Sequence, residues 1–232
     1  MKDWEKMPSY WITNNGENSL SSLRWSGSDN ADKIAALMIY IVFVHHAKID
    51  LINGESVQGI CSLSYSELSE ISGLSRAKVS GGIKILIEMK RVKKILVGRK
   101  NRYQLLDYAS EKGWAKLPVK KLYSETGSRL YAFHRFHLRV KNELNALKMY
   151  LLIAAFRSNS ENCCRMSYER ITEYTGINRN EIRSAISLLI NLGLIQVDTE
   201  ASKVNDGRSV NLYRLCYLEP YMHRGTLART GL

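Results

Sequence analysis

Residues 63–79, LSYSELSEISGLSRAKV, return 103 positions later as residues 166–182, MSYERITEYTGINRNEI, without a gap. The identical pairs include Tyr65/Tyr168 and Gly73/Gly176, and apolar residues occupy corresponding positions in both stretches. The similarity extends upstream, where residues 36–40 (ALMIY) correspond to residues 146–150 (ALKMY) at an offset of 110. A match of this extent predicts that the chain contains two copies of one module.

Each copy has the pattern of two short helices joined by a turn at a glycine. Ser64 and Glu67 have the spacing of a capping box, which predicts a helix that starts here and runs to Ser72. Gly73 comes directly after Ser72. This position fits the end of a helix, which favours a positive φ and therefore a residue without Cβ. Ser75 is placed to cap a second helix. Four apolar residues are expected on the buried face of that helix: Val79, Ile83, Leu86 and Ile87.

The second copy has the same signals in the same order. A helix is predicted over residues 168–175, before Gly176. Asn178 and Glu181 then form a variant of the capping box at the start of the next helix.

A longer apolar helix and a short strand precede each helix pair. In the first copy, the apolar spacing predicts a helix with one buried face, formed by Ile34, Leu37, Met38, Ile41 and Val44. The corresponding helix of the second copy is expected over residues 141–157. Strand-like stretches follow at residues 58–63 and at residues 163–166.

A β-hairpin is predicted after each helix pair. In the first copy, strand-like residues 92–97 and 102–106 flank a turn at residues 98–101. In the second copy, residues 194–199 and 210–216 flank a longer turn. A helix-turn-helix followed directly by a hairpin is the order of a winged helix.

The sequence therefore predicts a mainly α fold with small β-hairpins, in the α+β class. It would consist of two tandem winged helix-turn-helix domains derived from an internal duplication. The first domain would span residues 1–107 and carry a basic hairpin, and the second would span residues 108–232 and carry a longer hairpin and a short C-terminal tail. Because no linker rich in Pro, Gly or Ser lies between them, we expect the two domains to pack against each other.

The positive charge of the chain is concentrated in its central part. The net charge is +12, and residues 76–148 hold 19 basic against 5 acidic residues. Such a concentration indicates a polyanionic partner, nucleic acid before an anionic membrane. No apolar run approaches the length of a membrane span, and the N-terminus does not resemble a secretory signal. The four cysteines include no CxxC pair, which favours reduced, buried thiols in a cytoplasmic protein.

Two such modules in one basic chain resemble the tandem winged-helix DNA-binding proteins. Plasmid and phage replication initiators and double-winged-helix regulators are the most similar members. The resemblance rests on the order of the elements and on Gly73 and Gly176. It implies a sequence-specific protein that binds double-stranded DNA, located in the cytoplasm with the nucleoid. Its role would be transcription regulation or the initiation of plasmid or phage DNA replication, with a homodimer or the corresponding machinery as further partners.

The candidate DNA contacts lie on the second helix of each pair and on the hairpins. On the first copy's helix they are Arg76, Lys78, Ser80 and Lys84. On the second copy's helix they are Arg179, Asn180, Arg183, Ser184 and Ser187. Asn180 and Arg183 are the candidates for base readout, because Asn binds adenine and Arg binds guanine in bidentate fashion. The hairpin candidates for phosphate contact are Lys93, Arg99, Lys100, Arg102, Lys203 and Arg208.

A protein–protein scaffold is the alternative, because winged helices also occur in chromosome-segregation complexes. In that case the nearly neutral second copy would be a docking or dimerisation surface. His134 and His137 have a spacing that allows a shared metal, but no further ligands accompany them, so we expect packing or backbone contact. Since the chain has no phosphate-binding loop and no hydrolase motif, we expect no enzymatic activity, no metal and no cofactor.

Overall fold

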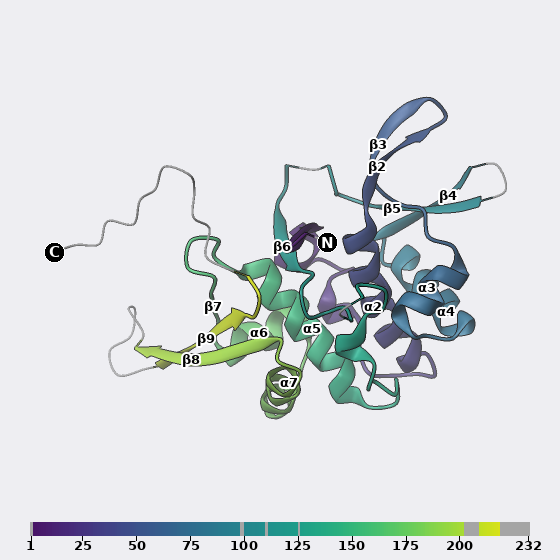
Figure 1. Cartoon of the computed structure of the whole chain (residues 1–232). Helices are drawn as coiled ribbons and strands as arrows, with labels where there is room; N and C mark the ends of the chain where they lie inside the picture. The colour runs from purple at the N-terminus through teal and green to yellow at the C-terminus, as the bar shows by residue number, and fades with distance from the viewer. Residues whose placement is uncertain (1, 98–99, 110, 125, 202–208, 219–232) are drawn as a thin grey trace.

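The computed structural model describes residues 2–97, 100–109, 111–124, 126–201 and 209–218 (Figure 1). This part of the chain contains seven α-helices, two short 3-10 helices and nine strands in three small antiparallel sheets. The mixture of helices and small sheets agrees with the predicted α+β class.

The first half of the chain places a helix pair and a sheet around one long helix. Its helices are α2 (Asn30–His46), α3 (Tyr65–Ser72) and α4 (Arg76–Glu88). The strands of its four-stranded sheet, in spatial order, are β2 (Lys48–Ile52), β3 (Glu55–Cys61), β5 (Lys100–Leu105) and β4 (Val92–Val97).

The second half repeats this order of elements, except that one strand instead of two lies between the long helix and the helix pair. Its helices are α5 (Lys141–Phe156), α6 (Tyr168–Thr175) and α7 (Arg179–Asn191). The strands of its sheet, in spatial order, are β7 (Cys164–Arg165), β9 (Ser209–Leu215) and β8 (Ile195–Ala201). The helix predicted over residues 168–175 has the same first and last residues as α6.

The N-terminal segment links the two halves. Strand β1 (Trp4–Pro8) pairs antiparallel with β6 (Trp114–Pro118), and the rings of Trp4 and Trp114 stack with centroids 5.9 Å apart. Short helices α1 (Tyr10–Thr13) and η1 (Leu20–Ser22) pack on α5 and α6, respectively, and η2 (Tyr131–Phe133) precedes α5. Helices α2 and α5 also contact each other directly. The two halves are thus packed together, as the absence of a linker predicted.

The five residues predicted for the apolar stripe of α2 are buried, but burial is not confined to one face of this helix. Every residue from Ile34 to His45 is buried, because α4 and the sheet cover one side of the helix and α5 covers another. The ring of Phe43 stacks on that of Tyr103 from β5, with centroids 5.0 Å apart. The hydroxyl of Tyr40 accepts a hydrogen bond from the Trp11 indole and donates one to the Pro8 carbonyl. One continuous core therefore spans both halves.

The predicted signals at the helix ends hold at four of five places, including Ser75, whose side chain accepts a hydrogen bond from the Lys78 amide at the start of α4. Ser64 and Glu67 form the capping box, and Gly73 and Gly176 have φ of 72° and 66°, in the left-handed region. The capping box predicted at Asn178 was wrong, because the Asn178 side chain makes no capping hydrogen bond. Glu181, the other residue of this predicted capping box, instead accepts hydrogen bonds from Lys141 and Asn145 on α5, at 2.6 and 3.4 Å.

The buried face of α4 is rotated from the predicted one. Ile87 is 38% exposed, whereas Ile85 is buried beside Val79, Ile83 and Leu86. Gly82 explains the rotation. Because Gly82 has no side chain, the backbone of α2 approaches α4 closely at this position, and the contact between the two helices is centred there. The prediction that placed Ile87 in the core was therefore wrong.

Replacement of Gly82 should destabilise the protein. A Cβ at this position would lie 2.9 Å from backbone atoms of Ala35 and Ala36, which can retreat only if α2 moves. We expect Gly82→Ala to lower the free energy of unfolding by about 1–2 kcal/mol, because overpacking exceeds the gain in helix propensity. Denaturant unfolding would measure the change.

The matched control is Ala185→Gly, at the corresponding position of α7. Ala185 is fully buried, and its loss should cost about 1 kcal/mol through helix propensity and a small cavity. A Gly82→Ala variant as stable as the wild type would contradict the close contact between α2 and α4.

All four cysteines are free thiols, and three of them are buried. Burial raises the pKa of both Cys61 and Cys164 to about 12, so these thiols stay protonated at neutral pH. Within the described residues, no helix combines the length and the apolar character that crossing a bilayer requires.

Candidate nucleic-acid interface

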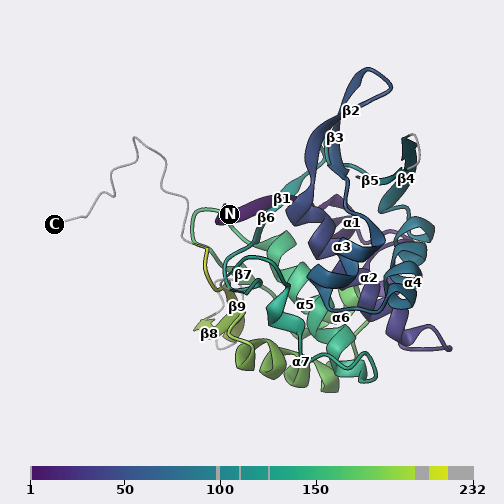
Figure 2. The ribbon, with the colours of Figure 1, turned by 45° about the vertical axis from the view of Figure 1, so that its right-hand side comes forward.

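The second helix of each pair lies at the outside of the molecule. Helix α4 packs on α2 and α7 packs on α5, while α2 and α5 contact each other between them (Figures 1 and 2). One face of α4 and one face of α7 are therefore open to solvent.

The open face of α7 carries a polar stripe. Its side chains are exposed and follow the spacing i, i+3, i+4 and i+7: Asn180, Arg183, Ser184 and Ser187. The structure thus brings together the two residues predicted for base readout. Asn142 of α5 donates a hydrogen bond of 3.2 Å to the Ser184 carbonyl, which fixes the middle of α7 against α5. The stripe therefore lies on a helix that α5 holds in place.

Arg179 stands at the start of α7 and has an acidic partner. Its guanidinium contacts the Glu169 carboxylate of α6 and lies 5.7 Å from the centre of the Tyr168 ring. The backbone amide of Glu169, followed by Arg179 and Ser167, lowers the pKa of the Glu169 carboxyl to about 2. Glu169 is therefore charged at neutral pH, and Arg179 has an anionic partner within the protein.

On α4, three of the four candidates are exposed: Arg76, Ser80 and Lys84. Arg76 donates a hydrogen bond to Ser66, and Lys84 lies 3.9 Å from Glu88. The fourth candidate, Lys78, is only partly exposed and forms a 2.8 Å ion pair with Asp32 of α2. Lys78 therefore ties α4 to the core, a partner that lies too far away in the sequence for the repeat to reveal.

In each half, an ion pair connects the outer helix to the long helix, but the signs of the two charges are reversed between the halves. Glu181 occupies the position of α7 that corresponds to Lys78 of α4, 103 residues earlier. Each residue pairs with the long helix of its own half, Glu181 with Lys141 and Lys78 with Asp32. Because these side chains orient the two outer helices, their first role is structural.

The β4–β5 hairpin presents a group of lysines. Lys93 and Lys94 of β4 and Lys100 of β5 are exposed. Arg102 differs, because its guanidinium lies 2.8 Å from Asp50 of β2 and donates a hydrogen bond to the Leu51 carbonyl. Three further candidates, Arg99, Lys203 and Arg208, lie outside the described residues.

The two histidines of the segment before α5 take part in local packing. The His134 ring stacks on Tyr131 with centroids 4.0 Å apart, and its Nδ1 lies 2.6 Å from the Tyr131 carbonyl. The backbone amide of His137 donates to the Glu143 carboxylate at 2.7 Å. In the part of the chain that the structure covers, no group of three or more potential metal ligands occurs.

Comparison with known proteins identifies one part of this arrangement. Residues 143–195 match the model of a family described as "Helix-turn-helix domain". The matched segment runs from the first turn of α5, through β7, α6 and α7, to the first residue of β8. Neither the curated proteins nor the solved structures gave a match. The second half thus contains a helix-turn-helix domain, which supports a DNA-binding role.

Proposed function

We propose that the chain is a sequence-specific double-stranded DNA-binding protein built from two tandem winged helix-turn-helix modules. The observation that carries the proposal is the exposed stripe from Asn180 to Ser187 on α7, inside the matched helix-turn-helix domain. The first half has the same long helix, helix pair and hairpin in the same order, with one additional strand, and this supports a duplicated origin. Each module would place its second helix in a major groove.

The two modules would divide the work of binding. Helix α7 carries the side chains suited to reading base edges, because Asn and Arg each form bidentate pairs with one base. The β4–β5 hairpin carries exposed lysines, which suit contact with the phosphate backbone of any sequence. The second half would therefore select the site, while the first half would supply most of the affinity.

In this proposal the protein acts in the cytoplasm on the nucleoid, as a transcriptional regulator or as a plasmid or phage replication initiator. It binds its target without catalysing a reaction and without a metal. Sequencing the fragments that the full chain selects from random duplex DNA would test the proposal. A defined motif about one or two helical turns long is the expected result. Selection of no motif would contradict it.

Truncation of the readout residues should reduce discrimination between sequences. We expect Asn180→Ala and Arg183→Ala each to weaken binding to the selected site by about 1–3 kcal/mol, because a bidentate base contact is lost. Binding to a scrambled duplex should change much less for Asn180→Ala. Fluorescence anisotropy with the two duplexes would measure both affinities.

Asn191→Ala provides the control on the same helix, because Asn191 is exposed at the C-terminal end of α7, beyond the stripe. Its affinity for both duplexes should match that of the wild type. Equal losses on the selected and scrambled duplexes for Asn180→Ala would rule out a role in base readout.

A protein–protein scaffold is the second candidate, and one feature favours it. The β2–β3 hairpin projects from the body of the molecule (Figures 1 and 2). Its edge strand β2 carries Ile49 and Leu51, each 65% exposed. Exposed apolar side chains on an edge strand suit contact with another protein. Measuring the affinity for duplex DNA over a range of salt concentrations separates the two candidates. The affinity of a DNA-binding protein falls steeply as the salt concentration rises, whereas a scaffold shows no such steep decrease.

A further inference from the structure

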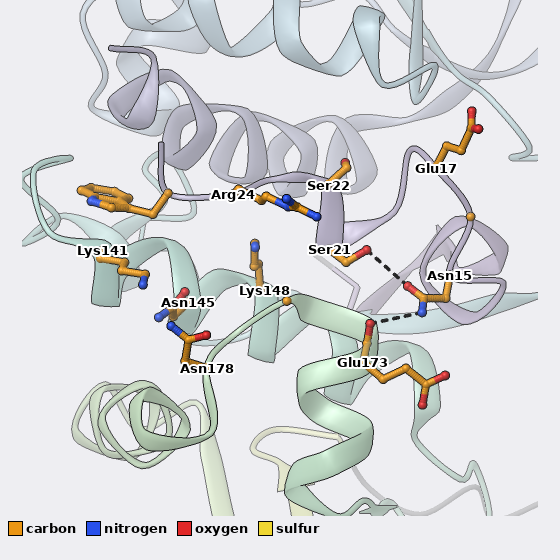
Figure 3. Close-up of a pocket in the computed structure, with 13 residues that line it drawn as sticks. Asn15, Glu17, Ser21, Ser22, Arg24, Lys141, Asn145, Lys148, Glu173 and Asn178 are labelled. Carbon is orange, nitrogen blue, oxygen red and sulfur yellow. Dashed lines mark hydrogen bonds between the residues drawn. The ribbon is translucent and has the colours of Figure 1, made fainter. Parts of the chain in front are cut away.

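A pocket of about 930 Å³ lies between the N-terminal segment and the helix-turn-helix of the second half (Figure 3). Residues 15–25 form one wall, and residues of α5, α6 and the turn before α7 form the other. The turn contributes Gly176 and Asn178. The pocket is therefore built from both halves of the fold.

One end of the pocket is strongly basic. Arg24, Lys141 and Lys148 line it together with the amides of Asn145 and Asn178. Figure 3 shows Lys148 extending from α5 toward Arg24. Glu17 and Glu173 line the opposite end, and their carboxylates point away from the basic group. The two ends of the pocket thus differ in charge.

Only one of the three cations has a carboxylate partner among the described residues. Lys141 pairs with Glu181 at 2.6 Å, whereas no described carboxylate lies within 4.0 Å of Arg24 or of the Lys148 amine. Lys148 is 2% exposed and donates a hydrogen bond of 2.8 Å to the Thr175 carbonyl, which is a neutral acceptor. Burial of a cation is costly unless an anion compensates it.

The fold itself does not require a lysine at this position. In the repeat, Lys148 corresponds to Met38 of α2, which is also 2% exposed and lies in the apolar core. A methionine therefore fills the equivalent place in the first half. The charge at Lys148 is a feature of the second half alone, and it faces the pocket.

We propose that this pocket binds a nucleoside phosphate, with the phosphate groups held by Lys148 and Arg24. Phosphate matches the two cations, and the Asn145 and Asn178 amides line the same end. Trp25 also lines the pocket and provides an aromatic surface for the base. The volume falls within the usual range for small-molecule sites. The proposal is for binding without hydrolysis, and the chain has no phosphate-binding loop of the ATPase type.

The site does not depend on the proposed DNA-binding function, although its position suggests a link. Gly176 and Asn178 belong to the turn that sets the direction of α7. A ligand in the pocket touches this turn and would change how α7 is presented to DNA. The nucleotide would then act as an effector of DNA binding.

Proton uptake offers a signature of phosphate at Lys148. Burial, with smaller contributions from Lys141, Lys33 and Arg24, lowers the pKa of Lys148 to about 7, against the opposing effect of Glu181. An anion beside the amine raises this pKa again. Binding at pH 8 should therefore be accompanied by proton uptake, which titration calorimetry detects in buffers of different ionisation enthalpy.

The direct test is calorimetry on the full chain without DNA, with ADP, ATP, pyrophosphate and adenosine as ligands. ADP and ATP should bind at one site per chain, and adenosine should bind at least about 10-fold more weakly because it lacks the charge-assisted contacts. Lys148→Met, which introduces the residue of the first half, and Arg24→Gln should each weaken ADP binding by about 10-fold or more. Arg129→Gln is the control, since Arg129 is exposed and does not line the pocket.

Two results would overturn the proposal. The first is the absence of binding by ADP and ATP, or unchanged ADP binding in Lys148→Met and Arg24→Gln variants that circular dichroism shows to be folded. The second is a loss of duplex affinity in these variants as large as their loss of ADP affinity, which would assign the phosphate to the DNA backbone. A chain that binds ADP but no duplex would refute the DNA-binding proposal and leave the nucleotide site standing.

Discussion

Replacement of Lys93, Lys94 and Lys100 by glutamate should weaken binding to duplex DNA by about 100-fold or more at physiological salt. These three lysines are exposed on the β4–β5 hairpin. Each phosphate that a lysine neutralises releases a counterion, a gain of about 1 kcal/mol at this salt concentration, and glutamate adds repulsion. Because phosphates carry no sequence information, specific and random duplexes should be affected alike.

A control with the same change in net charge separates the hairpin from the overall charge. Lys2, Lys120 and Lys121 are exposed and lie outside α4, α7 and their hairpins. Their joint replacement by glutamate should weaken duplex binding by much less than the hairpin variant. Equal losses in the two triple variants would contradict a specific role for the hairpin.

Phe43→Ala should lower the free energy of unfolding by about 3–5 kcal/mol, which is a large part of the stability of a typical domain. Phe43 is fully buried in α2, and its ring stacks on Tyr103 with an angle of 20° between the planes. Truncation removes this contact between the central helix and the sheet and leaves a cavity that the surrounding residues fill only in part. Urea unfolding followed by circular dichroism would measure the loss.

Ile87→Ala is the matched control, because sequence periodicity placed Ile87 in the core and the structure leaves it 38% exposed. Its replacement should change the free energy of unfolding by less than about 1 kcal/mol, since alanine is also the better helix former. If Ile87→Ala were as destabilising as Phe43→Ala, the orientation of α4 would be wrong.

Features that depend on neighbouring residues could be predicted from the sequence. The capping box of Ser64 and Glu67 spans four positions, and the helix ends at Gly73 and Gly176 need only a residue without Cβ. The 103-residue offset then extended these local signals to a second set of elements. The exposed stripe on α7 followed from helical spacing alone, because the apolar face of that helix is continuous.

Features that depend on distant partners could not be predicted. The complete burial of α2 requires α5, and strand β1 pairs with β6, more than 100 residues away. Strand β2 was not predicted, so the engagement of Arg102 with Asp50 was also missed. Lys78 looked like a free cation for the same reason, since its partner Asp32 lies on another helix.

Lys148 differs from its counterpart in the repeat, and this difference can be recognised in the sequence. The aligned stretches ALMIY and ALKMY differ by a lysine in place of Met38. The other four positions of these two stretches keep their apolar character, so the lysine is the one position of the five that an apolar core does not require. Arg24 and Trp25 line the same pocket but come from residues 15–25, far from Lys148 in the sequence, so only the structure shows that they share a pocket.

The salt dependence of duplex binding by the full chain is the most direct test of a DNA-binding role. Affinity for a duplex of about 30 base pairs would be measured by anisotropy from about 50 to 300 mM monovalent salt. Five or more phosphate contacts from the hairpin and the two outer helices predict that log K falls against log salt with a slope of about −4 or steeper. A slope near zero, or no binding at the lowest salt, would contradict the account.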